Sequence, residues 1–138
     1  MSTLSWPQTW RATAIILLLA GPAHGAEIWA ITDAQHPIAG HPDRLISLDA
    51  AQQLERDLSA DLPDDSQQAA ALVQKRLNAG GAGLQKQLTA AYQGVVDAWS
   101  LGITKVPAVV VDRRYVVYGE SDLGTAVARI EQFRKEQP

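Results

Sequence analysis

A short apolar hairpin near the C-terminus constrains the fold of this chain more than any other segment. The run Ala108–Val111 is rich in β-branched residues and follows Val106-Pro107 directly, which is typical of a short buried strand. The second run, Tyr115–Tyr118, follows after two arginines, so the pair predicts an antiparallel hairpin. Because the arginines lack the Asn-Gly signature of a type I′ turn, the turn type stays open.

The proline before this hairpin is the basis of a fold resemblance. Thioredoxin-like domains place a proline, usually after a cis peptide bond, immediately before the corresponding strand, where its ring faces the substrate groove. Val106-Pro107 resembles that element, and the resemblance implies a cis bond here. Redox thioredoxins also carry a CxxC after their first strand, whereas the corresponding stretch here, residues 33–37, reads Asp-Ala-Gln-His-Pro. The chain contains no cysteine, so disulfide exchange is excluded.

The first 25 residues have the pattern of a secretory signal peptide. Arg11 is their only charge, the apolar run at residues 12–20 is shorter than the ~20 residues of a membrane span, and small residues precede Ala26. The alternatives are an uncleaved anchor and a buried N-terminal helix. We expect cleavage near Gly25 and a periplasmic domain of 113 residues, 26–138, without a membrane span.

The charge of that domain argues against nucleic-acid binding. Without Arg11 it carries 11 basic and 15 acidic residues, a net charge of −4, and no run of like charge. Phosphate binding needs a concentrated basic face, so no direct nucleic-acid contact is expected.

The remaining elements follow from periodicity and capping signals. Strands are predicted at residues 27–32 and 44–48, with a turn-rich loop between them. Asp49 and Gln52 form a capping box for a helix that ends before Pro63, and Asp64–Ser66 begins a second helix through residue 78. A third helix is predicted at 82–101, and Ser121 is the predicted N-cap of the last helix. The fold class is therefore α/β, a thioredoxin-like sandwich with a helical insertion between its N-terminal strands and its C-terminal hairpin and helix.

The third predicted helix has an amphipathic pattern. One arc holds its apolar residues: Leu84, Leu88, Ala91, Tyr92, Val95, Ala98 and Trp99. We therefore predict that Trp99 lies in the core, as does Val110 in the middle of its strand. An exposed Trp99 would instead mark a partner surface. Gly94 interrupts the helix, which suggests close packing at that position.

A second resemblance covers nearly the whole domain. The pattern ITDAQHP after the first strand, the run from Ala91 to Asp122 and the signal peptide resemble a family of exported proteins encoded in integrating conjugative elements. The resemblance implies a role in the element's type IV secretion and mating-pair apparatus, with other proteins of that apparatus as partners. It implies no catalytic residues and no cofactor.

Two hypotheses for function remain. The first is a non-enzymatic protein-binding component of the conjugative apparatus, with a partner groove formed by Val106, Pro107, Ala34, Gln35 and His36. The second is a periplasmic protein that binds a small ligand or a metal through the His36 loop. Its candidate metal ligands are His36, His41, Asp33 and Asp43.

Overall fold

The computed structural model describes residues 25–137 and shows a mixed α/β domain. The signal peptide predicted at residues 1–25 lies outside this range except for Gly25. The described residues form seven elements: β1 (Ile28–Thr32), β2 (Arg44–Ser47), α1 (Ala50–Ser59), α2 (Ser66–Ser100), β3 (Ala108–Val111), β4 (Tyr115–Tyr118) and α3 (Leu123–Glu136). Their order along the chain agrees with the sequence analysis. None of the helices in residues 25–137 is long and apolar enough to cross a membrane.

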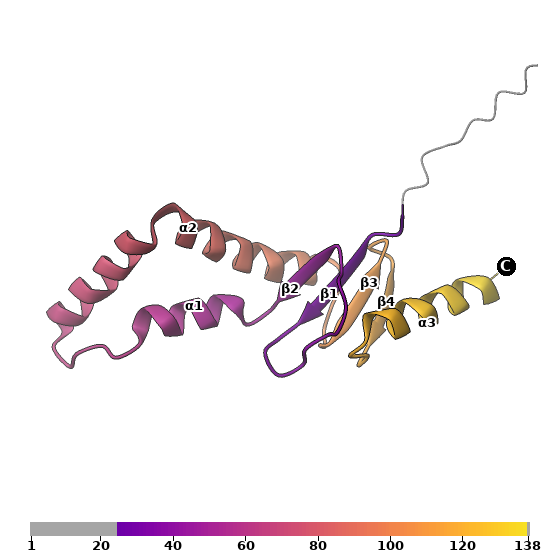
Figure 1. The fold of residues 1–138 in the computed structure, drawn as a ribbon, viewed down its shortest axis with the longest axis horizontal. Helices are drawn as coiled ribbons and strands as arrows, with labels where there is room; N and C mark the ends of the chain where they lie inside the picture. Colours follow the sequence, from indigo (N-terminus) through magenta and orange to yellow (C-terminus); the bar gives the residue numbers. More distant parts are fainter. Residues whose placement is uncertain (1–24, 138) are drawn as a thin grey trace, which may run out of the picture.

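The four strands form one mixed sheet in the order β2-β1-β3-β4 (Figure 1). β1 pairs with β2 in parallel and with β3 in antiparallel orientation, and the predicted hairpin of β3 and β4 is confirmed. The crossover from β1 to β2, residues 33–43, contains no helix, although parallel strands are usually joined through one. It instead forms a bridge between Ala39 and Asp122.

The turn of the hairpin differs from the expectation. It has three residues, Asp112 to Arg114, because Val111 pairs with Tyr115, and the N–H of Arg114 donates to the carbonyl of Val111 at 3.1 Å. Asp112 and Arg113 have φ angles of 54° and 53°, a region that aspartate adopts more readily than most residues. The sequence pattern predicts a two-residue turn at Arg113 and Arg114. The residues with positive φ are instead Asp112 and Arg113.

Of the predicted helix caps, Asp65 is confirmed, Asp49 is the N-cap residue of α1 without the predicted side-chain bond, and Ser121 is wrong. Asp65 accepts the N–H of Gln68 at 2.8 Å and begins α2, as expected. Asp49 makes no capping bond to α1, because its carboxylate binds the side chains of Ser47 and Gln53 instead. The N-cap of α3 is Asp122 and not Ser121.

The second and third predicted helices join into the single long helix α2. Gly81 divides it, with φ 52° and ψ −143°, values outside the helical region and accessible mainly to glycine. α1 and the first half of α2 extend away from the sheet (Figure 1). We call residues 50–90 the helical arm.

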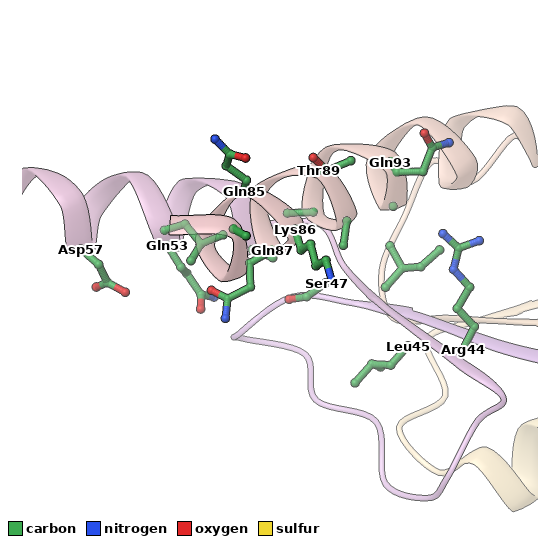
Figure 2. A pocket seen from close by; sticks show the side chains of 17 residues that line it. Arg44, Leu45, Ser47, Gln53, Asp57, Gln85, Lys86, Gln87, Thr89 and Gln93 are labelled. Carbon is green, nitrogen blue, oxygen red and sulfur yellow. The ribbon is translucent and has the colours of Figure 1, made fainter. Parts of the chain in front are cut away.

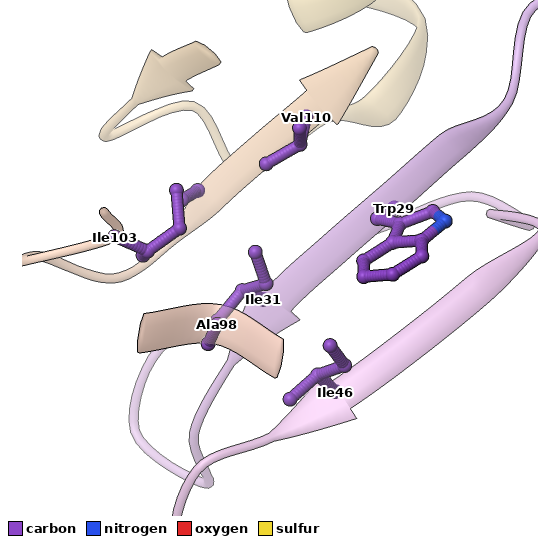
Figure 3. Packing of buried hydrophobic residues seen from close by; sticks show 7 residues of the cluster. Trp29, Ile31, Ile46, Ala98, Ile103 and Val110 are labelled. Carbon is purple, nitrogen blue, oxygen red and sulfur yellow. The ribbon is translucent and has the colours of Figure 1, made fainter. Parts of the chain in front are cut away.

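Each face of the sheet has its own core. On the α2 side, Trp29, Ile31, Ile46, Ala98, Ile103, Ala108 and Val110 pack together (Figure 3). On the α3 side the cluster consists of Ala30, Val109, Leu123 and Ala126. Val110 is only 1% exposed, so its predicted core position is confirmed.

The prediction that Trp99 lies in the core is wrong, because its side chain is 74% exposed. The buried residues of α2 are small: Ala91, Gly94 and Ala98. A Cβ at Gly94 would lie 3.0 Å from Cγ2 of Ile46, so the backbone of the helix approaches β2 closely there. This approach requires small side chains on the inner face and turns the aromatic residues outward.

Candidate functional site

The residues of the predicted partner groove lie at the end of the sheet where β1 ends and β3 begins. Ile31 pairs with Ala108, so residues 33–36 leave the sheet at the edge where Val106 and Pro107 enter it. The peptide bond between Val106 and Pro107 is cis, as predicted. The carbonyl of Pro107 accepts the N–H of Gly119 at 2.9 Å, which joins this segment to the end of β4.

The loop after β1 is organised around Asp33. Its Oδ1 accepts the backbone N–H groups of Gln35 at 3.0 Å and His36 at 2.9 Å, and it lies 2.7 Å from Nδ1 of His36. The side-chain bond from His36, with these N–H groups, holds the pKa of Asp33 below its usual value. The N–H of Ala34 donates to Asp49 at 3.2 Å. The carboxylates therefore stabilise the turn.

The four candidate metal ligands do not come together. Asp33 and His36 contact each other, but Asp43 accepts the N–H of Ile28 at 2.7 Å, and His41 is exposed. Within residues 25–137, the structure contains no group of three or more His, Asp or Glu side chains placed to hold a metal ion.

A small pocket lies beside the cis peptide bond. It has a volume of about 490 Å³ and is lined by Leu48, Trp99, Gly102, Ile103, Thr104, Lys105 and Val106. Val106 is the one residue of the predicted groove that lines it. Ala34, Gln35 and His36 are exposed at the same end of the sheet but outside the pocket, and Pro107 lies directly after it.

The exposed indole at this pocket continues an apolar stripe on α2. Tyr92, Val96 and Trp99 are 52%, 56% and 74% exposed. Their spacing of four and three residues places them on one face of the helix. We call these three residues the outer stripe. The hydroxyl of Tyr92 donates to Glu55 of α1 at 2.5 Å, which raises the pKa of Tyr92. The amphipathic pattern placed Tyr92 and Trp99 in one apolar arc with Ala91 and Ala98. It did not show which side of that arc faces the sheet.

A larger groove borders β2 and was not predicted. Its volume is about 1040 Å³, and it lies between β2, α1 and the part of α2 after Gly81 (Figure 2). All four residues of β2 line it, which means that the groove follows the edge of the sheet. Its helical walls are rich in amides: Gln53, Gln85, Gln87 and Gln93. No local motif could have shown this groove, because it depends on the strand order.

The helical arm itself has almost no core. From Gln52 to Ala90, in this fully described stretch, no residue is buried. The arm is held together by contacts at its surface, such as the bonds from Arg76 to the carbonyls of Leu58 at 2.8 Å and Ala60 at 2.6 Å. These bonds satisfy carbonyl groups at the end of α1.

Comparisons with known proteins place the chain in a family without assigning it an activity. Searches of curated proteins and of solved structures give no significant match. A family profile matches residues 25–136, which is almost all of the described domain. The chain therefore belongs to the family described as Protein of unknown function (DUF1525).

Proposed function

We propose that this chain is a non-enzymatic, periplasmic component of the conjugative transfer apparatus of an integrating conjugative element and that it acts by binding other proteins. The resemblance of residues 91–122 to exported proteins of such elements supports the assignment to this apparatus. The observation that carries the binding role is the helical arm, in which no residue from Gln52 to Ala90 is buried.

An arm of this kind gains little stability from its own packing. Helices in proteins depend mainly on the burial of an apolar face, and isolated short helices are marginal in water. The apolar side chains of the arm are only half-buried or exposed: Leu54, Leu58, Leu72, Val73, Leu77, Leu84 and Leu88. A partner that covered them would provide the missing apolar contact, and exposed apolar surface of this kind is typical of protein-binding sites.

The outer stripe offers a second contact surface near the sheet. Tryptophan and tyrosine are enriched at protein interfaces because they combine large apolar area with a polar group. Trp99 also lines the pocket beside Val106, so the stripe reaches one residue of the predicted partner groove.

We further propose that the fold is a thioredoxin-like sandwich with a helical insertion. The sheet order β2-β1-β3-β4, the parallel first pair and the cis bond before β3 support this classification. The absence of a helix between β1 and β2 is a departure, since the CxxC of redox thioredoxins begins such a helix. Without cysteine, binding is the role of the groove that remains.

Site-specific photo-crosslinking in conjugating cells tests the role in protein binding. A photo-reactive amino acid replaces Trp99 in one strain, Leu77 of the arm in a second, and Gln132, exposed on α3, in a control strain. We expect crosslinks to proteins of the transfer apparatus from the first two positions and not from the control. Equal labelling at all three positions, or normal transfer after deletion of the gene, would contradict the proposal.

Two further measurements test the location and the alternative function. Mass spectrometry of a periplasmic extract should find a mature N-terminus near Ala26, and an intact N-terminus in the membrane fraction would contradict export by cleavage. Replacement of His41, a candidate metal ligand outside the predicted partner groove, with alanine should leave transfer intact. Loss of transfer in this folded variant would favour the metal- or ligand-binding hypothesis.

A further inference from the structure

The groove beside β2 exposes the backbone of an edge strand. β2 pairs only with β1 among the described strands, so its second edge has no neighbouring strand. Such an edge presents alternate N–H and C=O groups that can pair with an added strand. Arg44, Leu45, Ile46 and Ser47 all line the groove, so the groove runs along the full length of this edge.

The two faces of β2 meet different surroundings. Arg44 and Ile46 point toward α2, where Arg44 binds Asp97. The Cζ atom of Arg44 also lies 4.5 Å from the ring centroid of Trp29 in β1. Leu45 points to the opposite face and is 61% exposed, because the crossover at residues 33–43 has no helix to cover it. A strand added beside β2 would therefore bring alternate side chains against Leu45 and against the groove wall.

The groove wall carries a cation without an ionic partner. Lys86 forms no ion pair within residues 25–137, whereas Arg44 is neutralised by Asp97. Figure 2 shows the side chain of Lys86 reaching from α2 toward β2. Glutamine amides and Thr89 line the same groove, and the one carboxylate among its described lining residues is Asp57, which lies on α1 away from Lys86 (Figure 2). This wall complements polar and acidic side chains, whereas Leu45 complements apolar ones.

We propose that this groove binds an extended segment of a partner protein, which adds to the sheet as a fifth strand beside β2. The segment alternates apolar residues, which contact Leu45, with polar residues, at least one of them acidic, which face Lys86. This inference rests on the proposed role in protein binding and specifies both a site and the chemistry of its ligand.

A displayed library of random nine-residue peptides, selected against the purified domain, is the test. We expect enriched peptides that alternate apolar and polar residues with an acidic residue at a polar position. Titration with a selected synthetic peptide should shift the NMR amide signals of residues 44–47 and slow their hydrogen exchange. Failure to enrich such a pattern, or shifts confined to other residues, would overturn the inference.

Two pairs of variants locate the site. Ala90→Trp fills the groove from the exposed surface of α2 and should weaken peptide binding at least tenfold, whereas Ala128→Trp on the exposed face of α3 should not. Lys86→Glu should remove the preference for acidic peptides, whereas Lys75→Glu, on the arm outside the groove, should keep it. Equal effects within either pair would contradict the assignment.

The oligomeric state separates a partner segment from a second copy of the chain. Sedimentation velocity should show a monomer for both the unaltered domain and Ala90→Trp. A dimer abolished by Ala90→Trp would replace the proposed segment with a second copy. Peptide binding without crosslinks at Trp99 or Leu77 would support the groove but not the proposed apparatus. Crosslinks without peptide binding would support the proposed role in the apparatus and contradict the groove as the binding site.

Discussion

Two glycines of α2 should respond in opposite directions to the same substitution. A Cβ at Gly94 would lie 3.0 Å from Cγ2 of Ile46, whereas a Cβ at Gly83 would meet no atom within 4 Å. In a helix, alanine is favoured over glycine by about 1 kcal/mol. Gly83→Ala should therefore increase the free energy of unfolding by about 0.5–1 kcal/mol.

For Gly94→Ala the same helical gain competes with crowding. Extra atoms in a packed core cost about 1–3 kcal/mol, so the net effect should lie between no change and a loss of about 2 kcal/mol. The expected gap between the two variants is thus about 0.5–3 kcal/mol.

Urea unfolding followed by circular dichroism at 222 nm measures both variants under one set of conditions, and thermal unfolding provides a second estimate. The helix signal is suitable because both positions lie in α2. If Gly94→Ala stabilises the domain as much as Gly83→Ala does, the close approach of α2 to β2 is wrong. The explanation for the outward position of Trp99 would then fail as well.

Three further predictions concern the aromatic residues, a helix cap and the arm. Trp99→Ala should change the free energy of unfolding by less than about 1 kcal/mol, whereas Trp29→Ala, at a site 4% exposed, should cost about 3–5 kcal/mol in the same denaturation assay. The N–H of Thr125 holds the pKa of Asp122 below its ordinary 3.8, so the stability that Asp122 adds is present above pH 3.8 and lost as the pH falls through its lower folded value. Asp122→Asn should flatten this acid loss in denaturation curves recorded from pH 5 to pH 2. Arg76→Ala should speed hydrogen exchange at the end of α1, measured by mass spectrometry, and unchanged exchange would contradict its role there.

The sequence predicted the elements well because their signals are local. Alternation of polar and apolar residues identified β1, a β-branched run identified β3, and Asp65 with its following glutamines identified the start of α2. Gly94 was correctly associated with close packing. In contrast, adjacent residues compete for one cap, and sequence could not distinguish Ser121 from Asp122.

The candidate surfaces were less predictable because they depend on how elements meet. The amphipathic pattern of α2 led to the prediction that large side chains such as Trp99 pack against the sheet. In the structure the small side chains of Ala91 and Ala98 pack there instead. The groove beside β2 follows from the strand order and from a crossover without a helix. Neither of these has a local signature in the sequence.

The position of the helical arm in the chain also affects how the domain folds. The pairing of Ile31 with Ala108 joins residues 77 positions apart, and the whole arm lies between them. Contacts between residues so distant in the chain slow folding, because loop closure costs entropy before the strand contacts form. Helices α1 and α2 form through local contacts and would shorten the effective loop if they folded first. The helical arm, which contributes little to the core of the native domain, would then increase the rate at which that core forms.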